Sequence, residues 1–296
     1  MGWGAVMNDT STGGRWSPSE AENHIDWLEL LAAIFPLKCF QSSFSGKHVK
    51  IMIDNTTAVS VINNMGTCHS DKCNSIGITI WEFCMSHNRV WLTAAHIPGS
   101  SNHRADKESR DFRSEDTEWM IDPTLLGIAL HALNFKPQID LFASRLNKQF
   151  PIYCSFKPDP DASYIDAFTL SWSDKHFYCF PPFSCVLQVL QKIIQDKETG
   201  IMVVPMWPTQ SWYPILTSLL VLPPITLPLS KYLLSLPAFP ENHPLHRKMS
   251  LLICLLSGNN LRALASYPDL LPWLLHPGGK GQPHNKIGRA SCRERG

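Results

Sequence analysis

The chain has 296 residues, 44% of them hydrophobic, so it can form one large domain or two ordinary domains with packed cores. Its 26 basic and 25 acidic residues give a formal net charge of +1, so overall charge does not indicate nucleic-acid binding. Nine cysteines at irregular spacings, with no export signal ahead of them, favour a reducing intracellular compartment, cytoplasmic or nuclear. Prolines interrupt the apolar stretch 215–235, so we expect no membrane-spanning helix and no membrane partner.

The first third of the chain alternates between strand and helix patterns. Residues 2–7 and 14–17 predict the two strands of a hairpin, with the turn over 8–13. Apolar residues at helical spacing between 27 and 35 predict a helix, which Pro36 should kink or stop. The next predicted elements are a strand over 48–53, helices over 56–63 and 73–86, a strand over 89–95 and a helix over 102–110. This alternation predicts an α/β domain.

A second α/β unit is expected after the charged residues 111–118. Strands over 138–142 and 200–205 flank an aromatic Pro-Pro loop and a helix over 186–196, which together predict a crossover unit. Pro, Leu and Ser dominate from residue 208 onward, and no compact fold is predicted there. The expected divisions are a first domain over 1–112, a linker over 113–136, a second domain over 137–222 and a Pro/Leu-rich linker region over 223–286.

Three acidic residues stand where a metal-dependent phosphodiesterase needs them. Asp54 ends a predicted strand, Asp106 lies on a short helix after a Pro-Gly loop, and Glu29 lies on the first long helix. Hydrolysis with two Mg²⁺ or Mn²⁺ ions about 4 Å apart needs carboxylates that converge from different elements. Taken singly, each acid has an ordinary reading as a helix-surface residue, a helix cap or a solvated charge. The combination favours a catalytic site.

His96 lies ten residues before Asp106, at the start of the Pro-Gly loop. A histidine at this place could shuttle a proton or assist product release, and its alternative is a loop residue without a role. We include His96 among the candidate catalytic residues.

Several motifs together resemble the ribonuclease H region of retrotransposon polyproteins, with the DIRS-like reverse transcriptases as the closest match. The motifs are Gly-Trp-Gly-Ala at 2–5, Trp-Leu-Glu-Leu-Leu-Ala at 27–32, Asp-Asn-Thr at 54–56, His-Ile-Pro-Gly at 96–99 and Asn-x-x-Ala-Asp at 102–106. Further similarity at 140–144, 181–183, 243–246 and 255–258 extends the resemblance over nearly the whole chain.

The resemblance implies a function, a set of partners and roles for single residues. Glu29, Asp54 and Asp106 would be metal-binding catalytic acids of a ribonuclease specific for RNA·DNA hybrids, with Mg²⁺ or Mn²⁺ as cofactor. Asn55, Asn102 and Arg104 would contact the RNA·DNA hybrid or DNA. The expected protein partners are the rest of the polyprotein, namely a reverse transcriptase and a tyrosine recombinase.

The chain also departs from the family pattern, which places Asp-Ala-Ser on a first strand just before Gly-Trp-Gly-Ala. Without that strand we expect an N-terminally truncated ribonuclease H-like mixed sheet with two unpaired edges, weak folding of residues 1–118 and little or no cleavage. Asp26 is no replacement, since it leaves the helix about 60° away from Glu29. The alternative function is a non-catalytic nucleic-acid-binding fragment whose aromatic side chains stack on bases.

The second unit is more distantly similar to phage-type DNA adenine-N6 methyltransferases, whose catalytic loop reads Asn/Asp-Pro-Pro-Tyr/Phe. Phe180 replaces the acidic or amide residue, and its ring has no oxygen to accept the target amino group. We therefore expect a small, degenerate methyltransferase-like α/β domain, in which Phe183 could still stack a base, rather than an active enzyme. Residues 287–296 resemble a translated sequencing adapter and are excluded from the fold prediction.

Overall fold

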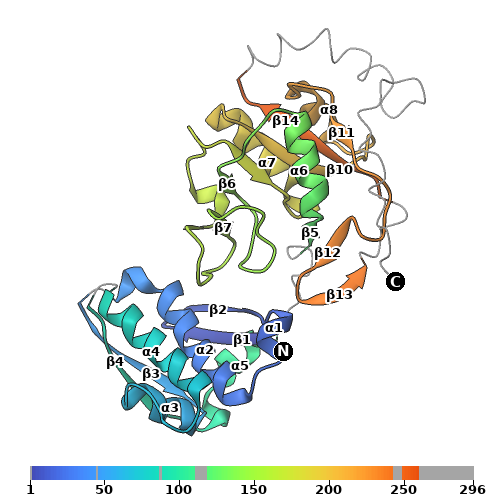
Figure 1. The fold of residues 1–296 in the computed structure, drawn as a ribbon. Helices are drawn as coiled ribbons and strands as arrows, with labels where there is room; N and C mark the ends of the chain where they lie inside the picture. Colours follow the sequence, from blue (N-terminus) through green and yellow to red (C-terminus); the bar gives the residue numbers. More distant parts are fainter. Residues whose placement is uncertain (1, 45, 87–88, 111–118, 243–248, 260–296) are drawn as a thin grey trace, which may run out of the picture. The chain divides into compact units, whose positions relative to one another are not determined.

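The computed structural model describes residues 2–44, 46–86, 89–110, 119–242 and 249–259. The chain divides into two compact units, each described here by itself. Unit 1 comprises Met1–Arg113 and Lys157–Ala162, and unit 2 comprises Ser114–Phe156 and Ser163–Gly296. Both units mix helices and strands (Figure 1), which confirms the predicted α/β class. No helix in the described ranges is both long and apolar enough to cross a membrane.

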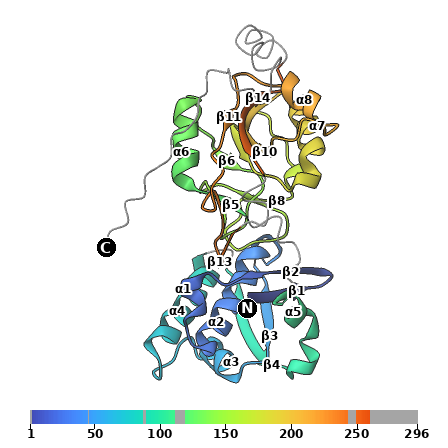
Figure 2. The same ribbon diagram turned by 90° about the vertical axis from the view of Figure 1, so that its right-hand side faces the viewer.

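Over its described residues, unit 1 has four strands in two separate pairs. β1 (Gly2–Met7) and β2 (Thr10–Arg15) form an antiparallel hairpin, whereas β3 (His48–Ile53) and β4 (Trp91–His96) are parallel. The helices are α1 (Pro18–Ala21), α2 (Ile25–Cys39), α3 (Thr56–Asn63), α4 (Asp71–Ser86) and α5 (His103–Glu108). Figure 2 shows the strands between α5 on one side and α2 and α4 on the other.

The Gly-Trp-Gly-Ala motif fixes the hairpin between two helices. Trp3 is buried against α2, and its ring meets that of Phe35 edge-on with 5.1 Å between centroids. Gly4 faces the opposite side, where a Cβ would collide with the carbonyl oxygen of Ala105 in α5. A Cβ at Gly13 would lie 2.8 Å from the carbonyl oxygen of Glu108. Glycine is thus needed at both positions because α5 packs directly on the hairpin backbone.

Two local predictions for unit 1 are wrong. α2 does not stop at Pro36 but continues to Cys39, since proline removes one donor while the N–H of Phe40 still donates to the Pro36 carbonyl at 3.0 Å. The hairpin turn is also shorter than predicted, because Asn8 adopts a left-handed backbone with a φ of 54° and β2 starts at Thr10. Asparagine tolerates this conformation better than most residues.

Unit 2 is built on a five-stranded sheet in the order β11-β14-β10-β9-β6. These strands are β6 (Ile139–Asp140), β9 (Phe177–Cys179), β10 (Thr199–Pro205), β11 (Ile225–Thr226) and β14 (Leu251–Ser257). α6 (Pro123–Ala132) covers one face, and α7 (Val186–Asp196) and α8 (Tyr213–Ser218) cover the other (Figure 2). Smaller sheets join β5 (Met120–Ile121) with β12 (Leu234–Leu236) and β13 (Phe239–Asn242), and β7 (Cys154–Ser155) with β8 (Tyr164–Ile165).

The central strands of unit 2 are buried on both faces. In β10, Met202 and Val204 belong to the core that includes α7, whereas Ile201 and Val203 belong to the core that includes α6. β9 and β10 are parallel and connected through α7, which confirms the predicted crossover unit. Two helix-covered faces explain why these strands are continuous apolar runs rather than alternating ones.

The expected linkers differ from what the structure shows. Residues 119–136, expected within a linker, form β5 and α6, and Leu126 and Ala129 of α6 are buried in the core. The Pro/Leu-rich region contributes β14, which pairs with β10 along its whole length. An apolar run without periodicity does not distinguish a buried strand from other structure, which is why the prediction failed. Residues 111–118, 243–248 and 260–296, with the adapter-like segment, lie outside the described residues.

Candidate active site

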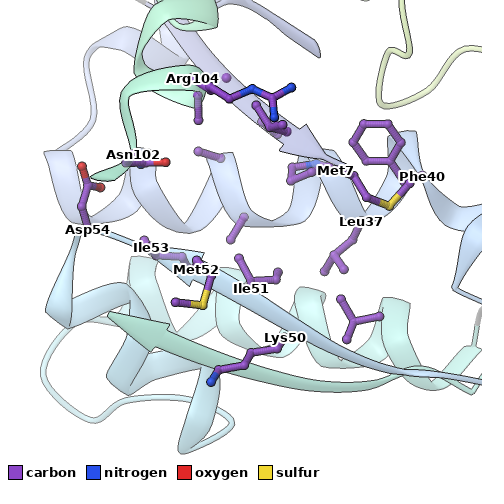
Figure 3. Close-up of a pocket in the computed structure, with 18 of the residues that line it drawn as sticks. Met7, Leu37, Phe40, Lys50, Ile51, Met52, Ile53, Asp54, Asn102 and Arg104 are labelled. Atoms are coloured by element: carbon purple, nitrogen blue, oxygen red, sulfur yellow. The ribbon is translucent and has the colours of Figure 1, made fainter. Parts of the chain in front are cut away.

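A cavity of about 360 Å³ lies in unit 1 between its two strand pairs (Figure 3). Residues 4–7 of β1 line one wall, residues 49–54 of β3 and its end line the other, and α2 and the start of α5 complete it. Figure 3 shows Asp54 and Asn102 at one end of the cavity and Met7, Leu37 and Phe40 at the other. One end is therefore polar and the other apolar.

Glu29 and Asp54 come together at the polar end. Glu29 projects from the N-terminal half of α2 into the cavity wall, and Asp54 directly follows β3. The pKa of the Glu29 carboxyl is raised to about 7, first by its burial and then by the negative charges of Asp54 and Asp26. Near neutral pH Glu29 therefore exchanges a proton readily, which is a property of acid–base and metal-binding carboxyls.

Two helix caps hold this acidic corner in place. The side chain of His24 accepts the N–H of Asp26 at 3.3 Å at the start of α2. Asn55 caps α3 by accepting the N–H of Ala58 at 2.8 Å, and its amide donates to Asp26 at 2.9 Å. Asn55 thus ties the start of α2 to the end of β3. These bonds give Asn55 a structural role in place of the nucleic-acid contact implied by the resemblance.

The loop after β4 also reaches the acidic corner. Ile53 and His96 are partners in the parallel pair β3 and β4, so both strands end at the same edge. A Cβ on Gly99 would lie 3.5 Å from Oδ2 of Asp54, so the Pro-Gly loop passes close to this carboxylate. His96 is exposed at that edge. The strand-end acid and the Pro-Gly loop, far apart in sequence, therefore meet as the motifs suggested.

Asp106 is placed differently from the other two predicted acids. Its carboxylate forms an ion pair with Arg110 on the next turn of the chain, at 2.7 Å, and its side chain is 45% exposed. The cavity is lined instead by Asn102, Arg104 and Ala105 of the same segment. Arg104 donates to the carbonyl oxygen of Asn8 at 3.2 Å, which fastens α5 to the hairpin turn.

The acidic corner contains one residue that the sequence analysis set aside. Asp26 lies close enough to Glu29 to raise its pKa, although it leaves the helix on a neighbouring face. The only signal for it in the sequence was its position three residues before Glu29, on the neighbouring turn. Within the described ranges, no three His, Cys, Asp or Glu side chains are grouped so that they could hold a metal ion. Glu29 and Asp54 thus form a two-carboxylate site with Asp26 beside it.

Unit 2 has its own buried acid. Asp140, at the end of β6, is 2% exposed and accepts the N–H groups of Gln149 at 3.0 Å and Phe142 at 3.4 Å. Burial raises its pKa to about 7, and those two hydrogen bonds oppose the rise. These bonds secure the loop that follows β6, which gives Asp140 a structural explanation.

The Pro-Pro loop of unit 2 is packed rather than open. The rings of Phe180 and Phe183 lie 6.3 Å apart, and Phe183 meets Trp207 edge-on at 5.2 Å. Both phenylalanines are partly buried against the core on the α6 side of the sheet. No model of a known protein family and no curated protein matches this chain.

Proposed function

We propose that unit 1 is a ribonuclease H-type domain derived from a retrotransposon polyprotein. Its ancestral chemistry is metal-dependent hydrolysis of RNA in RNA·DNA hybrids, which this chain performs poorly or not at all. The observation that supports the proposal best is the partly buried Glu29 carboxyl, whose pKa is raised to about 7 at the edge where Asp54 ends β3. The order of hairpin, helix, strand, two helices, strand and helix in unit 1 agrees with the resemblance of its motifs.

The carboxylates present suit one cation better than two. Mg²⁺ commonly binds proteins through one or two carboxylates and keeps several waters, so Glu29 and Asp54 fit a single hydrated ion. Two-metal hydrolysis needs further carboxylates to hold the second ion, and Asp106 is engaged by Arg110. When bound, the cation would supply electrostatic stabilisation of a phosphate. The carboxylates would hold it only when Glu29 is deprotonated, so binding should strengthen as pH rises through about 7.

A cleavage assay tests the hydrolytic part of the proposal. We expect the purified chain, with Mg²⁺ or Mn²⁺, to cleave a labelled RNA·DNA hybrid no faster than its Asp54→Asn variant. Cleavage that approaches that of an intact ribonuclease H and disappears in Asp54→Asn would overturn the predicted inactivity while supporting the assigned chemistry.

Cation binding tests the site itself. Mn²⁺ should raise the melting temperature of the parent chain at pH 8 and have little effect on the Glu29→Gln/Asp54→Asn variant. Asp106→Asn is the matched control and should keep the response, because its carboxylate is paired with Arg110. An equal loss in Asp106→Asn would show that three acids converge. Salt-dependent hybrid binding that none of these substitutions alters would favour the non-catalytic nucleic-acid-binding fragment.

For unit 2 we propose a degenerate methyltransferase-like domain without methyl-transfer activity. The support is the sequence of β9, Pro-Pro loop, α7 and β10, in which Phe180 supplies no acceptor for an amino group. Calorimetry with S-adenosylmethionine should show no binding. Specific binding together with methylation of DNA would contradict the proposal.

A further inference from the structure

Two strand edges face the same cavity in unit 1. Within the described part of the chain β1 is paired only with β2, and β3 only with β4. Both β1 and β3 contribute lining residues to the one cavity, from opposite walls. Each therefore turns its second edge, with backbone N–H and C=O groups, towards the space between them. Unpaired edges of this kind readily accept another strand.

The dimensions of the cavity suit a short strand. Its floor is one stripe of α2 at helical spacing, from Glu29 through Ala32, Ala33 and Pro36 to Phe40. Eleven helical residues span roughly 16–17 Å, and a strand of about six residues covers the same distance. β1 and β3 each contain six residues. Figure 3 shows their arrows pointing in opposite directions, so an inserted strand would be parallel to one and antiparallel to the other.

The side chains around the floor are apolar but incompletely covered. Val49 and Ile51 of β3 point towards the core yet are only partly buried, as are Ala32 of α2 and Phe44. In the sheets of unit 2 the corresponding strand residues are fully buried. Apolar side chains placed over α2 would remove this remaining surface from water, which stabilises a complex by roughly 25 cal/mol per Å² buried.

Charge defines one end of the groove. Glu29 and Asp54 line that end, with Asp26 close by, whereas Met7, Leu37 and Phe40 line the other. An inserted side chain that reaches Glu29 from above α2 is therefore favoured if it is basic.

We propose that this groove binds an extended peptide of about six residues as a β-strand between β1 and β3. The peptide places apolar side chains over α2 at alternating positions and a lysine or arginine next to Glu29 and Asp54. Main-chain hydrogen bonds to both edges supply affinity, and the alternating side chains supply selectivity. This proposal does not depend on hydrolysis or on a metal ion.

Blocked peptides test the proposal in EDTA and without nucleic acid, so its outcome is independent of the nuclease proposal. The probes are Thr-Lys-Thr-Val-Thr-Val and Thr-Val-Thr-Val-Thr-Lys, which place Lys at opposite ends of the face turned to α2. We expect at least one to bind in fluorescence anisotropy, and to slow amide exchange in β1 and β3. N-methylation of alternate amides should abolish binding because it removes main-chain donors.

Charge variants complete the test. Replacing Lys by Glu in the peptide, or making Glu29→Gln/Asp54→Asn in the protein, should weaken binding by about tenfold. Glu82→Gln, at an exposed position on α4, is the matched control and should change nothing. Circular dichroism of each variant confirms that it is folded. Absence of binding at millimolar peptide, or equal binding of the N-methylated peptide, would overturn the proposal.

Discussion

The two units solve the same architectural problem in opposite ways. In unit 2, β10 and β14 have a partner strand on both sides and helices over both faces. In unit 1, over the described residues, every strand has a single partner, and the hairpin and the parallel pair flank a cavity. A continuous sheet places unit 2's stability in its centre. Unit 1 depends on helix contacts and keeps strand edges and two acids available for binding.

The largest effect is expected at the centre of unit 2. Val203→Asp places a charge on a fully buried strand position and should destabilise unit 2 by more than about 4 kcal/mol. Hydrogen exchange followed by mass spectrometry should show loss of protection in β10 and β14 while unit 1 keeps its own pattern. Equal loss in both units would show that they unfold as one, and would contradict the separation drawn here.

A smaller effect is expected where α5 packs on the hairpin. Gly4→Val forces a side chain against the backbone of Ala105 and should destabilise unit 1 by about 2–3 kcal/mol, measured by urea unfolding. Gly127→Val is the matched control, because nothing lies within 4 Å of a Cβ at that position in α6. If Gly4→Val left the stability of unit 1 unchanged, the close packing of α5 would be wrong.

Glu29→Gln should stabilise unit 1 in a pH-dependent manner. The pKa of Glu29 is raised from 4.5 to about 7, so folded unit 1 binds more protons than the unfolded chain between these values. Its stability therefore falls as pH rises from 4.5 to 7, and the variant should lose this fall. After allowance for partial exposure, we expect a gain of about 1–2 kcal/mol at pH 8 and none at pH 4. An identical pH profile in both proteins would contradict the assignment.

The smallest effect concerns the start of α1. The Ser17 hydroxyl accepts the N–H of Glu20 at 3.2 Å, and the Ser17 N–H donates to the Glu20 carboxylate at 2.7 Å. Ser17→Ala should cost about 1 kcal/mol in urea unfolding of unit 1. The exposed Ser42→Ala is the control and should be neutral. A loss as small as that of the control would remove the capping box from the account.

Local patterns predicted most of the elements that position the site. The helix over 56–63 and the strand over 48–53 match α3 and β3, because Asn55 and the alternating strand pattern mark their ends. Periodicity failed for β14, since an apolar run such as Leu251–Ser257 suits several buried structures. Proline also misled at Pro36, where only one hydrogen bond near the end of α2 is lost.

For the candidate site, the sequence predicted neighbours better than roles. The meeting of Asp54 with the Pro-Gly loop follows from parallel strands that end at one edge. The ion pair of Asp106 with Arg110, and the tie between Asn55 and Asp26, depend on side-chain orientations that spacing alone does not fix. The part played by Asp26 follows from its distance to Glu29 in the fold.

The central claim is that Glu29 and Asp54 share one partly buried acidic site. The most direct measurement is an NMR titration of the Glu29 side-chain carboxyl in the parent chain and in Asp54→Asn. The account predicts a pKa of about 7 in the parent chain and a lower pKa in the variant, which removes one negative charge. A Glu29 pKa near its ordinary value of 4.5 in both proteins would contradict the site.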